Sequence, residues 1–201
     1  MEALHKDCPT IVPEEKLSDY LLVATASKEL AERITRGNED LYTRYGHTAQ
    51  LTLKPHIAIA RFAAKEEMED TLIRYIQRVC CTQEKFTVTL NNYSGFPPDR
   101  IFLRIQDPYP LHQLGKALGV INEYISSCSC PDLQLIQNVH ITTARNLPGN
   151  TFLKAMLDYS QRTFHEEFEV QELVLLRKTN GIPPIKTVNI FYLNNQLKNN
   201  N

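Results

Sequence analysis

The sequence predicts an α+β fold: a bilobal, pseudo-twofold duplicated domain with largely antiparallel sheets facing a central cleft and helices outside. Two observations lead to it. An H-I-x-x-A-R frame in "KPHIAIARF" (Lys54 to Phe62) recurs 84 residues later in "NVHITTARN" (Asn138 to Asn146). Around both copies the pattern reads helix, strand, helix, strand, strand, which indicates an internal repeat of about 27–107 and 108–194. A long unit that occurs only twice favours two lobes over a repeat array.

The first predicted elements are a buried strand and a helix. "DYLLVATA" (19–26) is a short apolar run typical of a buried strand. Ser27 can cap a helix that extends to about Tyr45, and Gly46 can stop it. This strand and helix open the folded part of the chain.

The first histidine segment is predicted to be a strand with two different faces. Ile57 and Ile59 alternate with His56, Ala58 and Ala60. Such a period of two gives one apolar face and one face open to something else.

A helix and a pair of strands complete the first half. Residues 65–80 place apolar side chains at helical spacing, with acids in the first turn. "KFTVTLNNY" (85–93) and "RIFLRI" (100–105) alternate as strands do, and "GFPPD" (95–99) is a turn between them. These two strands are expected to form a hairpin or meander.

The second half repeats this order. Its predicted elements are a helix over 111–125, a strand at 138–145, a helix from about 151 to 164, a strand over 167–178 and a strand over 185–193. Gly181, Pro183 and Pro184 mark the turn before the last strand. The folded domain is therefore expected to span 18–194. Residues 1–17 are expected to be a flexible segment and 195–201 a disordered polar tail.

Composition limits the function classes. Lys and Arg number 22 against 23 Asp and Glu, so no overall positive field exists to hold long nucleic acid. A nucleic-acid partner would be held locally, at an end or a short segment. The five cysteines lack zinc-site spacing and are expected to be reduced thiols. With no signal pattern and no long apolar run, we expect a cytoplasmic protein with no membrane partner, and a monomer is favoured.

The two histidine segments allow acid and base chemistry. In a strand, residues i and i+2 point to the same side, so His140 and Thr142 project together. If a pseudo-twofold relates the lobes, His56 falls in the equivalent place and two imidazoles face one cleft. Such a pair can act as general base and general acid, while hydroxyl or backbone donors hold a phosphate. A metal would need at least a third ligand, and none stands at a compelling position, so we expect no metal or other cofactor.

At these residues the sequence resembles the two-histidine phosphoesterases, also called the 2′-5′ RNA ligase or cyclic phosphodiesterase family. Their signature is a pair of His-x-Thr/Ser-x motifs (HxTx), each on a strand of one lobe. The resemblance spans roughly Asp19 to Leu193 and includes "LLVA", "KPHIAIARF", "GFPPDRIFL", "VHITTARNL" and "FEVQELVLLRK". It implies a bilobal α+β fold and metal-independent hydrolysis of 2′,3′-cyclic phosphate or 2′-5′ phosphodiester bonds in RNA ends or nucleotides.

Residue by residue, the resemblance implies that His56 and His140 are catalytic and that Thr142 binds the phosphate. Ala58 stands where the family has Thr or Ser, so the first clamp lacks its hydroxyl. A hydroxyl bond to a charged group contributes roughly 1.5–3 kcal/mol, and its loss would weaken phosphate or transition-state binding by about one to two factors of ten. Two interpretations stay open: an enzyme with altered substrate preference, and a nucleotide- or RNA-end-binding module with little turnover.

Four further residues are candidates for the site. Arg61 and Arg145 each follow their histidine by five residues, and strict alternation points both away from the imidazole face. A bulge or turn at a strand end could bring either to a phosphate, and Arg145 is favoured because the loop after it suggests a cleft rim. Phe96 and Phe102 are candidates for base stacking, although aromatics in strands and turns more often belong to the core.

Overall fold

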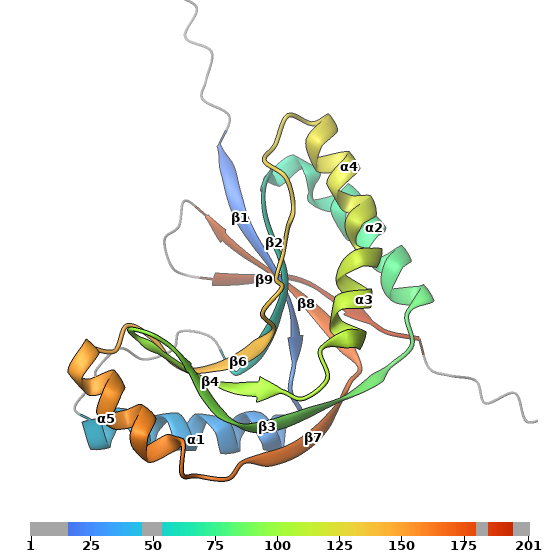
Figure 1. Cartoon of the computed structure of the whole chain (residues 1–201). Helices are drawn as coiled ribbons and strands as arrows, with labels where there is room; N and C mark the ends of the chain where they lie inside the picture. The colour runs from blue at the N-terminus through green and yellow to red at the C-terminus, as the bar shows by residue number, and fades with distance from the viewer. Residues whose placement is uncertain (1–15, 46–53, 180–184, 195–201) are drawn as a thin grey trace, which may run out of the picture.

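The computed structural model describes residues 16–45, 54–179 and 185–194. Gly46, the turn at 181–184, the tail at 195–201 and most of the 1–17 segment lie outside the described residues. The predicted fold class is confirmed: helices lie outside a strongly bent antiparallel sheet (Figure 1). None of the helices in the described residues is long and apolar enough to cross a membrane.

Nine strands of the described residues form one sheet, in which the strands pair in the order β7-β3-β4-β6-β2-β1-β8-β9 and β5 pairs with β2. They are β1 (Leu17–Thr25), β2 (His56–Lys65), β3 (Phe86–Phe96), β4 (Arg100–Ile105), β5 (Gln134–Leu135), β6 (His140–Ala144), β7 (His165–Val170), β8 (Glu172–Thr179) and β9 (Ile185–Tyr192). Every pairing between these strands is antiparallel. The two histidine strands, β2 and β6, are neighbours at the centre of the sheet.

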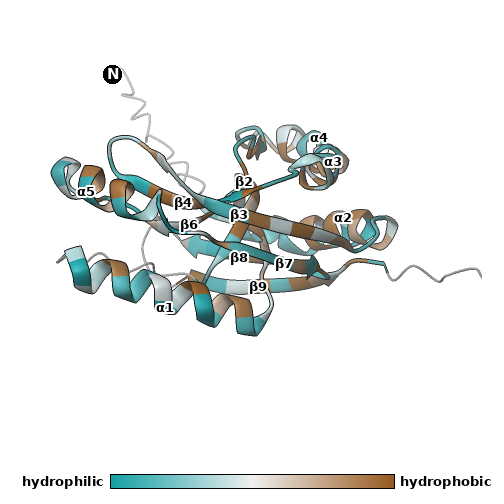
Figure 2. Cartoon of the chain, turned by 60° about the horizontal axis from the view of Figure 1, so that its bottom comes forward, coloured by the Kyte–Doolittle hydropathy of each residue, from teal (hydrophilic) through white to brown (hydrophobic). Residues whose placement is uncertain are grey.

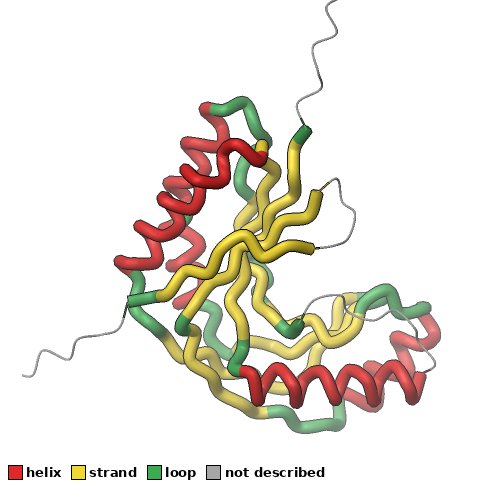
Figure 3. The backbone as a smooth tube through the Cα atoms, turned by 180° about the vertical axis from the view of Figure 1, so that it is seen from behind, coloured by secondary structure: helices red, strands yellow, loops and turns green. Residues whose placement is uncertain are grey.

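The helices cover the two arms of this sheet from the outside (Figure 3). They are α1 (Lys28–Tyr45), α2 (Glu69–Thr82), α3 (Tyr109–Ala117), α4 (Gly119–Ser127) and α5 (Gly149–Tyr159). Helices α1 and α5 lie along the arm of β7, β3, β4 and β6, and α2, α3 and α4 lie along the other arm. Each arm therefore gathers elements from both halves of the chain.

The structure confirms Ser27 as the N-cap of the first helix, α1. The backbone N–H of Leu30 donates to the Ser27 hydroxyl at 3.3 Å, as an N-cap does.

The core lies between the helices and one face of the sheet. Ile57, Leu103 and Ile141, from three adjacent central strands, are completely buried in it. Figure 2 shows hydrophobic residues alternating with hydrophilic ones along helices and strands, as two-faced elements require. Residues that alternate with the buried set on β2, β4 and β6 therefore face the opposite side of the sheet, where the histidines lie.

One expected strand is in fact two. The run 167–178 divides at Gln171 into β7, which pairs with β3, and β8, which pairs with β1 on the other arm. Val170 and Leu173 are both fully buried although they are three residues apart, which strict alternation does not allow. The extra residue marks the place where the chain crosses from one arm to the other.

The helix expected over 111–125 is also divided. Leu118 separates α3 from α4, and its backbone N–H bonds to the carbonyls of both Leu114 and Gly115. The predicted apolar face is nevertheless buried along its whole length, at Leu111, Leu114, Leu118, Ile121 and Ile125. The helical spacing therefore predicted which side chains are buried, because α3 and α4 keep the same side toward the sheet.

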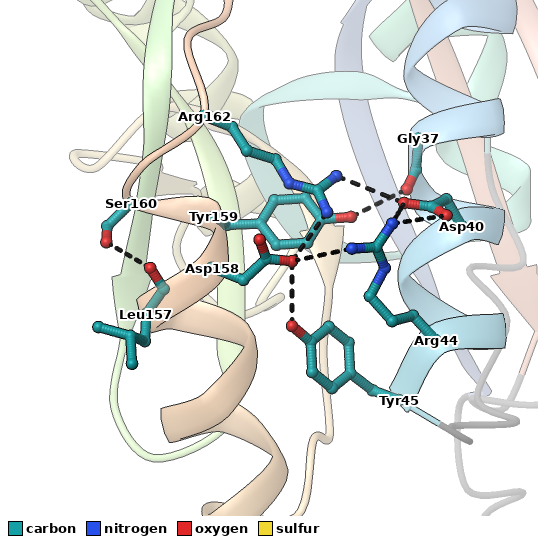
Figure 4. A network of polar contacts seen from close by, with 9 residues as sticks. All are labelled: Gly37, Asp40, Arg44, Tyr45, Leu157, Asp158, Tyr159, Ser160 and Arg162. Atoms are coloured by element: carbon teal, nitrogen blue, oxygen red, sulfur yellow. Dashed lines mark hydrogen bonds and ion pairs between the residues drawn. The ribbon is translucent and has the colours of Figure 1, made fainter.

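A polar network joins α1 to the end of α5 (Figure 4). Arg162 donates to Asp158 at 2.8 Å, and the Tyr45 hydroxyl donates to the same carboxylate at 3.0 Å. The hydrogen bond from Arg162 lowers the pKa of Asp158. Arg162 and Arg44 also reach Asp40 of α1, at 3.4 and 3.2 Å. Each exposed pair adds only about 0–1 kcal/mol, so the network orients the two helices more than it stabilises the fold.

Candidate active site

The two histidines lie on one face of two neighbouring strands. Ile57 pairs with Ile141 in antiparallel register, so His56 lies opposite Thr142 and Ala58 lies opposite His140. Residues directly opposite have Cβ atoms about 4.5–5.5 Å apart, and diagonal ones about 7–8 Å. The two histidines therefore lie diagonally across the Ile57 and Ile141 pair, close enough for His56 to lower the pKa of His140.

Both imidazoles are held by the same kind of hydrogen bond. Nδ1 of His56 lies 2.8 Å from the carbonyl oxygen of Lys54, and Nδ1 of His140 lies 2.6 Å from that of Asn138. A carbonyl oxygen can only accept, so Nδ1 carries the proton in both rings. This fixes the tautomer and leaves Nε2 of each imidazole available to a substrate.

The environment lowers the pKa of both histidines. Burial is the main cause for each, because it disfavours the charged imidazolium. The positive charge of Arg145 lowers the pKa of His56 further, and Arg100 and His56 do the same for His140. Both rings are therefore mainly neutral near pH 7, each with a basic Nε2.

The residues that flank the two histidines differ. His56 pairs with Thr25 of β1 on one side and lies opposite Thr142 on the other, so two hydroxyls flank it. His140 has Ala58 on one side and pairs with Arg104 of β4 on the other. A twofold axis through the Ile57 and Ile141 pair relates the two histidines, but it does not relate the residues beside them.

Strand β4 lies beside β6, on the side away from β2. Phe102 pairs with Thr142, and Arg100 and Arg104 alternate with it on the same face. The ring of His140 lies 4.7 Å from that of Phe102, centroid to centroid. A hollow of about 240 Å³ opens here, lined by His140, Phe102, Arg104, Phe96 and residues 137–139 among others.

Of the two aromatic candidates, only one presents its ring to solvent. Phe96 stacks on Phe102 with centroids 4.4 Å apart and is 36% exposed, whereas Phe102 is 8% exposed. Phe102 packs against the ring of His140, and Phe96 keeps part of its ring exposed.

The two candidate arginines are placed differently from strict alternation. Ala58 pairs with Val23 and Ala60 with Leu22, so Ile59 is an extra residue in β2. This bulge returns Arg61 to the histidine face, although farther along the strand. Arg145 follows the end of β6, is exposed, and lies close enough to His56 to lower its pKa.

Sequence reasoning missed Thr25, Arg100 and Arg104. A signal for the arginines exists in "RIFLRI", where Arg100, Phe102 and Arg104 alternate with the apolar residues that indicated a strand. Thr25 had no such signal, because its position beside His56 depends on strand pairing. Within the described residues, no group of three or more His, Cys, Asp or Glu is arranged to hold a metal ion.

Solved structures share this fold. E. coli LigT complexed with 3′-AMP superposes with a TM-score of 0.66 at 17% identity, covering 89% of this chain and 99% of LigT. The protein TT0787 of Thermus thermophilus gives a TM-score of 0.65 at 16% identity, with the same two coverages of 89% and 99%. A structure described as a phosphoesterase gives 0.62 at 17% identity, covering 88% and 98%. At these identities the likeness shows the fold alone.

A comparison with curated proteins finds no match. The family model of the 2′-5′ RNA ligase superfamily matches residues 24–182, which include both histidine strands and β4. This match confirms the resemblance that the two histidine motifs indicated. The chain belongs to the 2′-5′ RNA ligase superfamily.

Proposed function

We propose that this protein is a metal-independent phosphodiesterase that hydrolyses 2′,3′-cyclic phosphate or 2′-5′ phosphodiester bonds in RNA ends or nucleotides. The observation that carries the proposal is the matched pair of imidazoles. Each is fixed by an Nδ1–H bond to a carbonyl two residues earlier, and each keeps Nε2 for the shared face. Related structures of LigT were solved with 3′-AMP and with ATP, which supports a nucleotide as the ligand class.

The pair supplies both proton transfers of the reaction. Nε2 of one imidazole takes a proton from the attacking water while the new P–O bond forms. Nε2–H of the other donates a proton to the ribose oxygen that leaves when the old P–O bond breaks. Which histidine is the acid depends on the direction of the reaction.

Substrate binding provides the acid. Before a phosphate binds, both histidines are mainly neutral because their pKa values are lowered. A phosphate anion between them favours the imidazolium and raises the pKa of the ring it contacts. One ring then holds a proton while the other stays neutral, the state that acid and base catalysis requires.

The phosphate is held mainly from the β6 strand. In the proposed complex the Thr142 hydroxyl donates to a nonbridging oxygen, and Arg145 and Arg100 add positive charge near the two histidines. Ala58 has no hydroxyl to contribute from β2.

Ala58 also favours a second candidate function. Without a hydroxyl opposite His140, the chain can be a nucleotide- or RNA-end-binding module that turns over little. Binding of the same ligands with no detectable hydrolysis would establish that function in place of the first.

Hydrolysis of adenosine 2′,3′-cyclic phosphate in EDTA tests the proposal. We expect turnover that EDTA leaves unchanged and that the double variant His56→Ala, His140→Ala abolishes. His165→Ala is the matched control, since this exposed histidine begins β7, three strands from β6. Undiminished turnover in the double variant would refute the two-histidine mechanism, and loss of turnover with EDTA would refute metal independence.

A further inference from the structure

Arg104 lies at the edge of the candidate site with its guanidinium partly fixed. It is exposed and pairs with His140 across β4 and β6. Its Nε donates to the carbonyl oxygen of Asn91 at 3.1 Å, which orients the planar group. Among the described residues no carboxylate pairs with it, so its two terminal nitrogens are available to an anion.

The hollow beside Arg104 suits a phosphate and part of a nucleoside. It has about 240 Å³ and includes His140, Arg104 and the exposed ring of Phe96 in its walls. None of the residues that line it is acidic. A guanidinium binds phosphate oxygens in a bidentate fork, and an aromatic ring beside it accepts a base.

The opposite direction along the sheet is less suited to an anion. Beyond His56 come Thr25 and then Glu172, and the Thr25 hydroxyl donates to that carboxylate at 3.4 Å. The larger hollow on this side, of about 790 Å³, mixes Lys28, Arg36 and Lys54 with Glu32 and Glu172. An anionic chain that leaves the histidines is therefore better accommodated toward β4.

The spacing distinguishes a second phosphate from the scissile one. The scissile group lies between β2 and β6, and β4 is the next strand beyond β6. With strands about 4.8 Å apart, the row of Arg104 lies roughly 7 Å from the centre of the histidine pair. A separation of this order is one nucleotide step along the chain, and the bond to Asn91 holds the side chain toward β3, away from the histidines.

We propose that Arg104 and the hollow beside His140 bind a second phosphate, the one on the 5′ side of the ribose that carries the scissile group. The substrate class is then a nucleotide or RNA end with that 5′ phosphate, in preference to a nucleoside cyclic phosphate. This inference rests on the proposed function for its catalytic readout and has an independent binding readout.

Three substrates that differ in one group test it: adenosine 2′,3′-cyclic phosphate, the same compound with a 5′-phosphate, and a diadenosine ending in the cyclic phosphate. In the intact protein kcat/KM should be about tenfold or more higher for the last two, as a charge-assisted fork provides. Arg104→Leu should remove that advantage and change the first substrate less than about twofold. Arg104→Lys keeps the charge without the fork, so its advantage for the last two substrates should lie between that of the intact protein and that of Arg104→Leu.

The pattern across substrates decides the outcome. A preference for the 5′-phosphorylated nucleotide alone points to free nucleotides, and one shared by the diadenosine points to RNA ends; both support the inference. An equal loss on all three substrates would overturn it, because Arg104 would then hold the scissile phosphate. Unchanged rates on all three would also overturn it. Arg78→Leu, an exposed arginine on α2, is the charge-matched control.

Binding separates this inference from the proposed function. If no substrate is turned over, calorimetry with adenosine 3′-phosphate and adenosine 3′,5′-bisphosphate still tests Arg104. The bisphosphate should bind about tenfold more tightly to the intact protein, and Arg104→Leu should remove that difference. Equal affinity of the intact protein for the two ligands would overturn the inference.

Discussion

The two histidine strands, β2 and β6, share their imidazole geometry and differ in most of the residues beside it. His56 and His140 each bond through Nδ1 to the carbonyl two residues before them. Yet His56 stands between Thr25 and Thr142, whereas His140 stands between Ala58 and Arg104. The local backbone geometry repeats with the sequence frame, while the groups that would contact a phosphate have diverged. The shared part therefore supports acid and base chemistry, and the divergent part is where substrate preference would be set.

The largest expected effect comes from removing either shared group. His56→Ala and His140→Ala should each lower kcat/KM by about 10²–10⁴, because each removes one proton transfer. Steady-state hydrolysis of a 2′,3′-cyclic nucleotide measures this. A variant that stays within about threefold of the intact protein would show that the histidine it lacks takes no part in the chemistry.

The next effect tests the hydroxyl on the β6 side. Thr142→Val removes the hydroxyl and keeps the shape, and it should cost about ten- to a hundredfold in kcat/KM, since a hydrogen bond to a charged oxygen contributes roughly 1.5–3 kcal/mol. Thr142→Ser keeps the hydroxyl and is the control. If Val and Ser at this position behave alike, Thr142 does not contact the phosphate.

A smaller effect is expected from restoring the missing hydroxyl. Ala58→Thr should improve kcat/KM or phosphate binding by up to about tenfold, because position 58 lies opposite His140 as Thr142 lies opposite His56. Ala58→Val matches its size without the hydroxyl and should give no gain. Equal results for Thr and Val would mean that a hydroxyl at this position does not reach the substrate.

The smallest expected effect is on the pH dependence of kcat/KM. Burial and nearby positive charge lower the pKa of both histidines, so the acid limb of kcat/KM in the free protein should lie below the usual histidine value of about 6.5. Activity should persist as pH falls through 6.5, decline at lower pH when Nε2 of the base is protonated, and decline at higher pH when the acid has lost its proton. A rate profile flat from pH 5 to 9 would contradict acid and base roles for this pair.

The lowered pKa values of the two histidines also make the free energy of unfolding depend on pH. The unfolded chain takes up protons on these histidines as pH falls through about 6.5, whereas the folded chain takes them up only at lower pH. Their contribution to the free energy of unfolding is therefore largest above pH 6.5, decreases as pH falls toward the lowered folded values, and then levels off. Urea unfolding at pH 7.5 and 5.5 measures this decrease in the free energy of unfolding. The decrease is compared between His56→Ala and the control His165→Ala.

Alternation within single strands was enough to place the histidine face. Ile57 and Ile141 go into the core and His56 and His140 face away from it, as the period of two requires. The repeated frame identified the pair, and Ala58, where the second copy has Thr142, was visible from the sequence. These features depend on neighbouring residues of one chain segment, so the sequence expresses them directly.

Which residues stand beside each histidine was decided by the tertiary structure. The register of β2 on β6 puts Ala58 opposite His140, and the pairing of β4 with β6 puts Arg104 on the other side of that ring. The bulge at Ile59 places Arg61 on the histidine face of β2. The run expected as one strand divides at Gln171 into β7 and β8, which belong to different arms of the sheet. Pairing between distant segments depends on how whole surfaces pack together, which local periodicity does not encode.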